Sequence, residues 1–218
     1  MSDNTVFETI GRYGVVPVVA IDSVEAALPL ADALLEGGLP VIEITFRTAA
    51  AAEVIEKIAQ QRSELLVGAG TVLTLDNLHA AKDCGAKFGV APGLSPEIVA
   101  AAGEIDLPFV PGVCTPSDVE CGLSLGCRVL KFFPSEALGG VKMLKALAGP
   151  YGHTGVKFVP TGGVNAANLE SYLSLDSVAA CGGTWIAKRP DLAEGNWKDI
   201  TQRCREVAEI VARVGGKE

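Results

Sequence analysis

Two ionisable side chains lie in apolar stretches where a solvated charge is not expected. Lys131 is in the run Arg128–Phe133, and Glu43 is in the run Val41–Phe46. Burial in apolar surroundings disfavours an ammonium group and favours the neutral amine, which is the form that attacks carbonyl carbon. A carboxyl group held beside such an amine can move protons during the same reaction. The two residues therefore predict a lysine nucleophile assisted by an acid–base group.

Structural roles for the same two residues stay open. A lysine in a strand can extend its amino group to solvent from the strand end, or pair with a buried carboxylate. Glu43 could be that carboxylate, because a buried acid without a partner is strongly destabilising. The structural and catalytic roles are compatible, since each group alters the charge state of the other.

The order of predicted elements indicates how these residues are brought together. Apolar strand-like runs alternate with helical runs. The predicted strands are 15–21, 41–46, 66–72, 87–91, 109–113, 128–133, 156–161 and 178–181. The predicted helices are a short N-terminal one ending at 7–11, one between the cap Asp22-Ser23 and Gly37-Gly38, one opened by Ser95-Pro96, and 49–60, 76–84, 115–125, 140–148, 165–173 and 199–214.

This alternation predicts parallel strands with helical crossovers. Eight such units favour an α/β fold of the closed (β/α)8 TIM-barrel type, with a short N-terminal helix and one domain over residues 1–218. An open doubly wound sheet is the alternative, but its glycine-rich fingerprint is missing after the first strand. In a barrel, reactive groups come from the carboxyl ends of the strands.

Other candidate residues follow predicted strands. Arg47 could form a surface ion pair or bind a carboxylate through its planar guanidinium. The small residues of the run Val67–Thr71 indicate either tight packing or close approach of a ligand, with the Thr71 hydroxyl available to an anion. Pro92-Gly93 indicates a turn at the mouth of the barrel.

Two pairs of glycines end the last two predicted strands, in Thr161–Asn165 and Cys181–Trp185. A single such pair usually forms a turn. Two pairs on adjacent strands indicate more, because main-chain N–H groups can converge there on an anion, helped by the positive end of a helix. The loops after strands seven and eight are the recurrent phosphate site of this barrel.

Composition excludes several classes of protein. The 218 residues carry a net charge of −8 with a pI near 4.9, which argues against nucleic-acid and anionic-membrane partners. No apolar run approaches the roughly 18 residues of a membrane span, and residues 1–4 show no export signal. The 6 cysteines lack zinc-like spacing and are expected to be reduced core residues. We therefore expect a cytoplasmic protein without a metal or cofactor.

The motifs together resemble those of the 2-keto-3-deoxy-6-phosphogluconate (KDPG) aldolases, also called 4-hydroxy-2-oxoglutarate aldolases. The similarity covers nearly the whole chain, and the Lys-Phe-Phe-Pro run combined with the acid on the second strand is specific. The matching runs are Glu43–Thr48, Val67–Val72, Pro92-Gly93, Val110–Val113, Lys131–Pro134, Gly139–Lys142, Pro160–Gly163 and Gly182–Trp185.

The resemblance implies a class I (Schiff-base) aldolase, which cleaves KDPG to pyruvate and glyceraldehyde 3-phosphate and acts also on 4-hydroxy-2-oxoglutarate. Its partners would be a small 2-keto acid and a phosphorylated aldehyde, and the family is typically homotrimeric. The resemblance also implies a role for each matching residue: Lys131 as Schiff-base lysine, Glu43 as proton shuttle, Arg47, Thr71, Pro92 and Phe133 as substrate-binding residues, Thr161 in stereoselectivity, and Gly162, Gly163, Gly183 and Thr184 as the phosphate site.

One position departs from the family pattern, and three other functions stay open. Thr184 stands where serine is expected; it keeps the hydroxyl, so the departure concerns fit and affinity for phosphate. An aldolase for the galactonate-derived epimer would use the same residues. A sugar-phosphate isomerase on another phosphate-binding barrel would need acid–base pairs but no buried lysine. A non-catalytic binder of keto acids would have no need for Glu43 beside Lys131.

Overall fold

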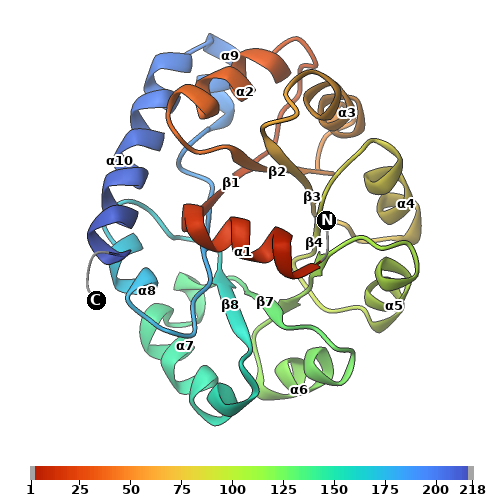
Figure 1. Ribbon diagram of the computed structural model, residues 1–218, viewed down its shortest axis with the longest axis vertical. Coiled ribbons are helices and arrows are strands. Elements are labelled where there is room, and N and C mark those ends of the chain that lie inside the picture. The colour runs from red at the N-terminus through yellow and green to blue at the C-terminus, as the bar shows by residue number, and fades with distance from the viewer. Residues whose placement is uncertain (1–2, 216–218) are drawn as a thin grey trace.

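The computed structural model describes residues 3–215 and has an α/β fold with parallel strands inside and helices outside (Figure 1). The strands are β1 (Val15–Val19), β2 (Val41–Thr45), β3 (Leu66–Gly70), β4 (Gly89–Val90), β5 (Phe109–Val110), β6 (Gly112–Val113), β7 (Val129–Phe132), β8 (Lys157–Pro160) and β9 (Cys181–Gly183). The α-helices are α1 (Asp3–Tyr13), α2 (Ala27–Glu36), α3 (Ala51–Gln61), α4 (Leu75–Asp83), α5 (Pro96–Glu104), α6 (Pro116–Ser124), α7 (Gly140–Ala148), α8 (Leu169–Leu173), α9 (Arg189–Glu194) and α10 (Trp197–Gly215). Two short 3-10 helices are η1 (Glu136–Leu138) and η2 (Gly149–Thr154).

The strands form a curled parallel arrangement in two sheets, ordered β5-β4-β3-β2-β1-β9 and β6-β7-β8. Strands that follow one another in sequence pair in parallel, for example through Val41↔Leu66 and Val129↔Lys157. The helices between them cover the outer face, so that every residue of β1, β2 and β3 is buried. This confirms the predicted alternation of parallel strands and helical crossovers.

The predicted strand 109–113 is divided at Pro111 into β5 and β6. Proline has no N–H group to donate to a neighbouring strand. The next residue, Gly112, donates instead to the carbonyl of Gly93 at 3.0 Å, while Lys131 N–H donates to the carbonyl of Pro111 at 2.8 Å. The chain therefore passes from the first sheet to the second at this proline.

The last predicted strand is in the wrong place. Within residues 178–181, Val178 makes only an isolated bridge to Phe158, and β9 begins at Cys181. The glycine pair Gly182-Gly183 is therefore part of the strand rather than a turn after it. A second isolated bridge, Thr161↔Gly182, connects the end of β8 to β9.

Some predicted helix boundaries agree with the structure and others do not. Ser95 caps α5 as predicted, accepting a hydrogen bond from Ile98 N–H at 3.4 Å. Ser23 Oγ accepts a hydrogen bond from Ala26 N–H at 3.4 Å, as a capping residue does, but a turn follows it and α2 begins only at Ala27. The predicted helix 165–173 is reduced to α8, and α9 was not predicted.

Helix α1 lies across the centre of the surrounding helices (Figure 1). Its side chains Phe7 and Ile10 line a small cavity together with Val16 and Val129, which are near the starts of β1 and β7. The helix therefore covers the amino-terminal ends of the strands and leaves their carboxyl ends uncovered.

Within residues 3–215, no helix combines the length and the apolar character needed to cross a bilayer. The expectation of a cytoplasmic protein without an export signal stays a prediction. It rests in part on residues 1 and 2, which lie outside the described residues.

Candidate active site

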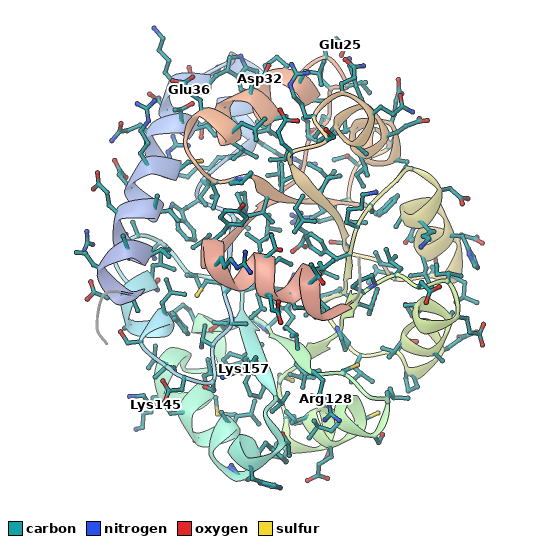
Figure 2. All side chains as sticks on the ribbon, in the orientation of Figure 1. Glu25, Asp32, Glu36, Arg128, Lys145 and Lys157 are labelled. Carbon is teal, nitrogen blue, oxygen red and sulfur yellow. The ribbon has the colours of Figure 1, made fainter. Side chains whose placement is uncertain are left out.

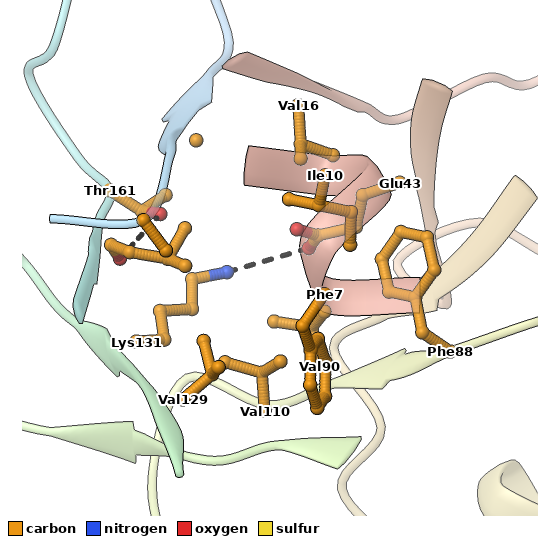
Figure 3. A pocket seen from close by; sticks show the side chains of 13 residues that line it. Phe7, Ile10, Val16, Glu43, Phe88, Val90, Val110, Val129, Lys131 and Thr161 are labelled. Atoms are coloured by element: carbon orange, nitrogen blue, oxygen red, sulfur yellow. Dashed lines mark hydrogen bonds and ion pairs between the residues drawn. The ribbon is translucent and has the colours of Figure 1, made fainter. Parts of the chain in front are cut away.

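Lys131 and Glu43 point toward each other inside the curled sheet (Figure 3). Lys131 comes from β7 and Glu43 from β2, and the distance from Lys131 Nζ to Glu43 Oε1 is 3.4 Å. Both side chains are almost fully buried, with exposed fractions of 6% and 5%. The period of two along each strand places both on the inner face, as expected from the sequence.

The surroundings of this pair are apolar. The Lys131 amino group lies over the ring of Phe133, 5.7 Å from its centroid, in range of a cation–π contact. On the side toward α1, a cavity of about 20 Å³ separates the pair from Phe7 and Ile10, which is room for about one water molecule. The open side of the pair is therefore toward the carboxyl ends of the strands, which α1 does not cover (Figure 1).

Gly70 makes room for the Glu43 carboxyl group. A Cβ atom at Gly70 would lie 2.1 Å from Glu43 Oε1, and one at Gly68 would lie 2.3 Å from the ring of Phe88. Both distances are shorter than any van der Waals contact allows. The small residues of the run Val67–Thr71 thus serve packing at these two positions, and at Gly70 the packed group belongs to the site itself.

We expect Gly70→Ala to lower activity while leaving the fold intact. Alanine suits the backbone of β3, but its methyl group displaces the Glu43 carboxyl group, and a misplacement of about 1 Å can cost about 10² in rate. Steady-state kinetics and thermal unfolding of the variant measure the two effects. Gly103→Ala on α5 is the matched control, because a Cβ there meets no atom within 4 Å. Equal activity of both variants would contradict the positioning role of Gly70.

Arg47 extends from the end of β2 and is held by its own strand. Its Nε donates to Thr45 Oγ1 at 3.0 Å, and Thr45 Oγ1 donates to the carbonyl of Val19 at 3.0 Å. Arg47 forms no ion pair with any acid among residues 3–215. The exposed guanidinium is thus oriented but uncompensated, which favours the predicted carboxylate-binding role over a surface ion pair.

Thr71 adopts an unusual backbone conformation at the end of β3. Its φ is +58°, a left-handed value that a β-branched residue rarely adopts. Such a conformation costs on the order of 1–3 kcal/mol and is found mainly at functional sites. The half-buried Thr71 side chain directly follows the carboxyl end of β3. Pro92, at the end of β4, is also half-buried, with its carbonyl packed against Gly112.

Thr161 lies next to the last strand and faces inward. It is 3% exposed and lines the same small cavity as Lys131 and Glu43. A Cβ atom at Gly182 would lie 2.2 Å from Thr161 Oγ1, so this glycine accommodates the threonine side chain. The requirement for glycine at 182 arises from this contact, which no local turn signal could indicate.

The two glycine pairs are adjacent, since Thr161 bridges to Gly182. Gly162 and Gly163 have φ values of +96° and +85°, which favour glycine, whereas Gly183 is buried in β9 against Trp185. Thr184 is exposed beyond the strand end. The pairs therefore differ: one is a left-handed turn at the mouth, and the other allows close packing.

A polar network beneath the first glycine pair was not predicted. The N–H groups of Ser135 and Glu136 donate to the carbonyls of Thr161 and Gly162 at 2.8 and 3.0 Å. The Tyr172 hydroxyl donates to the Glu136 carboxylate and lies 2.7 Å from Ser135 Oγ. Burial, together with the Glu136 carboxylate, raises the pKa of Tyr172 to about 12. The tyrosine therefore stays protonated at neutral pH and can hold this turn.

A larger cavity of about 480 Å³ opens at the carboxyl ends of β1, β2 and β9. Its lining residues include Arg47 and Thr184, which were assigned from the sequence to the carboxylate and phosphate sites. Lys188 and Arg189 also line it and were not singled out from the sequence. Two adjacent basic residues shortly after the second glycine pair were the feature of the sequence that could have indicated them.

Comparison with known proteins gives a consistent assignment. The chain matches the family model for the KDPG and KHG aldolases over residues 6–203. It is 43% identical over 206 residues to the 2-dehydro-3-deoxy-phosphogluconate aldolase of Haemophilus influenzae, with 94% of this chain and 96% of that protein covered.

Solved structures show the same likeness. KDPG aldolase from Legionella pneumophila, with pyruvate captured at low pH as a covalent carbinolamine intermediate, has a TM-score of 0.89 and 40% identity, covering 95% of this chain and 98% of that one. The Zymomonas mobilis KDPG aldolase with 3-phosphoglycerate has a TM-score of 0.84 and 36% identity, covering 94% of each chain.

The fold, the buried lysine–glutamate pair and these relatives define the class: the protein is an aldolase, a carbon–carbon lyase. Its family follows from the extent of the match. The chain belongs to the KDPG and KHG aldolase family.

Proposed function

We propose that the protein is a class I aldolase that cleaves KDPG to pyruvate and glyceraldehyde 3-phosphate, and that it also cleaves 4-hydroxy-2-oxoglutarate. The observation that carries the proposal is the pair of Lys131 and Glu43, buried together with 3.4 Å between Nζ and Oε1. Borohydride reduction in the presence of pyruvate tests it, because only a Schiff base is fixed as a secondary amine.

The reaction begins with attack of Lys131 Nζ on the ketone carbon of the 2-keto acid. The resulting carbinolamine loses water to give an iminium ion, whose positive nitrogen accepts the electrons of the breaking C3–C4 bond. Glu43, directly or through a water molecule, takes the C4 hydroxyl proton as the aldehyde forms. It then protonates C3 of the enamine, and hydrolysis of the new iminium releases pyruvate and the free amine.

Residues at the mouth hold the pyruvate part of the substrate in this proposal. The oriented guanidinium of Arg47 binds the carboxylate, since a planar fork suits two parallel hydrogen bonds. Thr71 adds a hydroxyl, and Pro92 and Phe133 shape the walls. The support is that Arg47 forms no ion pair among residues 3–215 and that Thr71 has a left-handed backbone conformation. The Legionella relative, captured with pyruvate as a carbinolamine, is consistent with this assignment.

The glycine pairs and Thr184 supply the phosphate site. Gly162 and Gly163 have no side chains to cover the N–H groups of their turn, and Gly163 is exposed. The bridge between β8 and β9 puts Gly183 and Thr184 beside this turn. Main-chain N–H groups and a hydroxyl are suitable donors for a phosphoryl group.

We also infer that the two sheets form one closed (β/α)8 barrel and that residues 1–218 are a single domain. Two features support closure: the chain runs continuously from β5 to β6 through Pro111, and isolated bridges join β8 to the β9 segment. If β5 and β6 count as one strand, the nine strands of the described chain become eight. A homotrimer without a metal or cofactor remains a prediction from the family.

A lyase is favoured over the two unrelated functions considered above. An isomerase or a keto-acid binder leaves the buried Lys131 unexplained, whereas Schiff-base chemistry uses both members of the pair. The epimer derived from galactonate differs only in the configuration at C4, so discrimination depends on the residues near that carbon.

We expect Thr161→Val to narrow the preference between the gluconate- and galactonate-derived epimers. Valine keeps the shape that fills the space over Gly182 but removes the hydroxyl, which can hydrogen-bond the C4 oxygen. A lost hydrogen bond of this kind corresponds to about 10-fold in selectivity. The ratio of kcat/KM for the two epimers measures it, and an unchanged ratio would contradict the role.

A further inference from the structure

Among residues 3–215, three cationic side chains and no acidic one line the cavity at the carboxyl ends of β1, β2 and β9. Its lining residues are Val18, Ala20, Arg47, Thr184, Ala187, Lys188 and Arg189. Arg47 has a role in holding the pyruvate carboxylate under the proposed function. Lys188 and Arg189 are two further cations beside Thr184 without an assigned role.

Helix α10 contacts the segment that carries Lys188 and Arg189 through the side chain of Arg203. Arg203 Nη1 donates to the carbonyl of Ile186 at 2.8 Å and to Asp191 Oδ2 at 2.5 Å. Asp191 Oδ2 also accepts from Lys188 N–H at 3.4 Å. The hydrogen bond from Arg203 lowers the pKa of Asp191, which keeps the carboxylate charged and the contacts in place. The backbone at Lys188 is therefore fixed before any ligand binds.

The side chains themselves are free to engage an anion. Lys188 is exposed and forms no ion pair among residues 3–215. Arg189 forms an ion pair with Asp22 at 3.3 Å, and the two side chains of this pair are 55% and 68% exposed. An ion pair so exposed to solvent contributes little, so a dianionic ligand can replace the aspartate.

The overall charge of the protein makes such a cluster favourable for binding an anionic substrate. The chain carries a net charge of −8, whereas KDPG has a carboxylate and a phosphoryl group that together carry about three negative charges. A like-charged protein repels this ligand at long range, and local cations at the entrance oppose that repulsion and raise the local concentration of the anion. Lys188 and Arg189 are placed at that entrance.

We propose that Lys188 and Arg189 bind the phosphoryl group of the substrate and give the enzyme its preference for phosphorylated over unphosphorylated 2-keto acids. This rests on the proposed aldolase function. The glycine turn and Thr184 supply neutral donors to the phosphoryl oxygens, and the two cations supply the charge. Thr184 lines the cavity with both cations, so one phosphoryl group can contact donors of either kind.

The test is the variant with Lys188→Gln and Arg189→Gln together. We expect its ratio of kcat/KM for KDPG to that for 4-hydroxy-2-oxoglutarate to fall about 10-fold or more, mainly through KM, since charge-assisted hydrogen bonds of this kind act on binding. Inorganic phosphate should inhibit KDPG cleavage competitively in the wild type, with a Ki raised by a similar factor in the variant.

The matched control is Arg128→Gln with Lys157→Gln, which removes the same charge from two exposed positions, one just before β7 and one at the first residue of β8 (Figure 2). These residues lie at the covered ends of the strands, so the substrate ratio should stay at the wild-type value. An equal fall in both double variants would overturn the proposal in favour of long-range steering. An unchanged ratio in the Lys188/Arg189 variant would overturn it outright.

Pyruvate trapping in the same preparations separates this proposal from the proposed function. If borohydride labels the wild type with pyruvate while the substrate ratio does not respond to Lys188 and Arg189, only the phosphoryl-binding proposal is wrong. If the wild type is not labelled, the aldolase assignment itself is wrong. If the Lys188/Arg189 double variant is labelled at the wild-type level and its ratio of kcat/KM for the two substrates is reduced, the result supports both the aldolase assignment and the phosphoryl-binding proposal.

Discussion

Borohydride added in the presence of pyruvate is expected to inactivate the enzyme and to attach one pyruvate-derived group to each chain, at Lys131. The amine lies in an apolar interior beside one carboxyl group, at an Nζ–Oε1 distance of 3.4 Å, so proton transfer can supply the neutral nucleophile. Peptide mapping by mass spectrometry locates the label. A label on Lys142 or Lys145, both exposed on α7, would contradict the assignment.

Lys131→Arg is expected to abolish both the label and KDPG cleavage, because a guanidinium group stays protonated and cannot attack carbonyl carbon. Lys142→Arg makes the same change on the surface of α7 and should keep both. EDTA should leave the wild-type rate unchanged, since the iminium provides the electron acceptor that a metal provides in other aldolases. Activity that persists without labelling, or that requires a divalent metal, would exclude the Schiff-base mechanism.

Glu43→Gln is expected to lower turnover by about 10² or more while the protein still folds and still forms the Schiff base in part. Glutamine fits the space left by Gly70 and can accept a hydrogen bond from Lys131 Nζ, so packing is preserved. It cannot accept the C4 hydroxyl proton or return a proton to the enamine. Rapid-quench measurement of trapping and steady-state cleavage separate the two steps.

Near-normal turnover of the Glu43→Gln variant would show that Glu43 is only an ion-pair partner of Lys131. Thermal unfolding is the control, because loss of a buried charged partner also destabilises the fold. A loss of rate that follows the loss of folded protein would likewise be structural. A loss of rate in fully folded protein is the expected result.

The inward placement of Lys131 and Glu43 could be predicted from the sequence, because it depends on the alternation of side chains along a strand. A strand alternates its faces every two residues, so the positions of Lys131 and Glu43 within their runs place both in the interior. The alternation of strands and helices likewise specifies parallel pairing. The positions of Lys131 and Glu43 within their strands were therefore enough to predict that these residues, 88 positions apart, face the same interior.

The remaining features depend on contacts between distant segments, which local signals do not report. The sequence around Gly182 indicates a turn, but the residue lies in β9, and glycine is required there because a Cβ atom would overlap the Thr161 side chain. The sequence gives no sign that Tyr172 differs from other helix residues, but its hydroxyl donates to Glu136, whose backbone contacts the turn after β8. The role of Arg203 arises only when α10 packs beneath the segment that carries Lys188.

The covering of one end of the strands by α1 has a kinetic consequence. With Phe7 and Ile10 closing the far side, both products of the cleavage leave through the same opening. In the proposed mechanism the three-carbon keto acid is still attached to Lys131 when the aldehyde forms closer to that opening. The aldehyde therefore departs first, and in the condensation direction the keto acid enters first. The covalent bond to Lys131 thus sets the order of the two binding events in the proposed mechanism, and α1 leaves a single opening through which both occur.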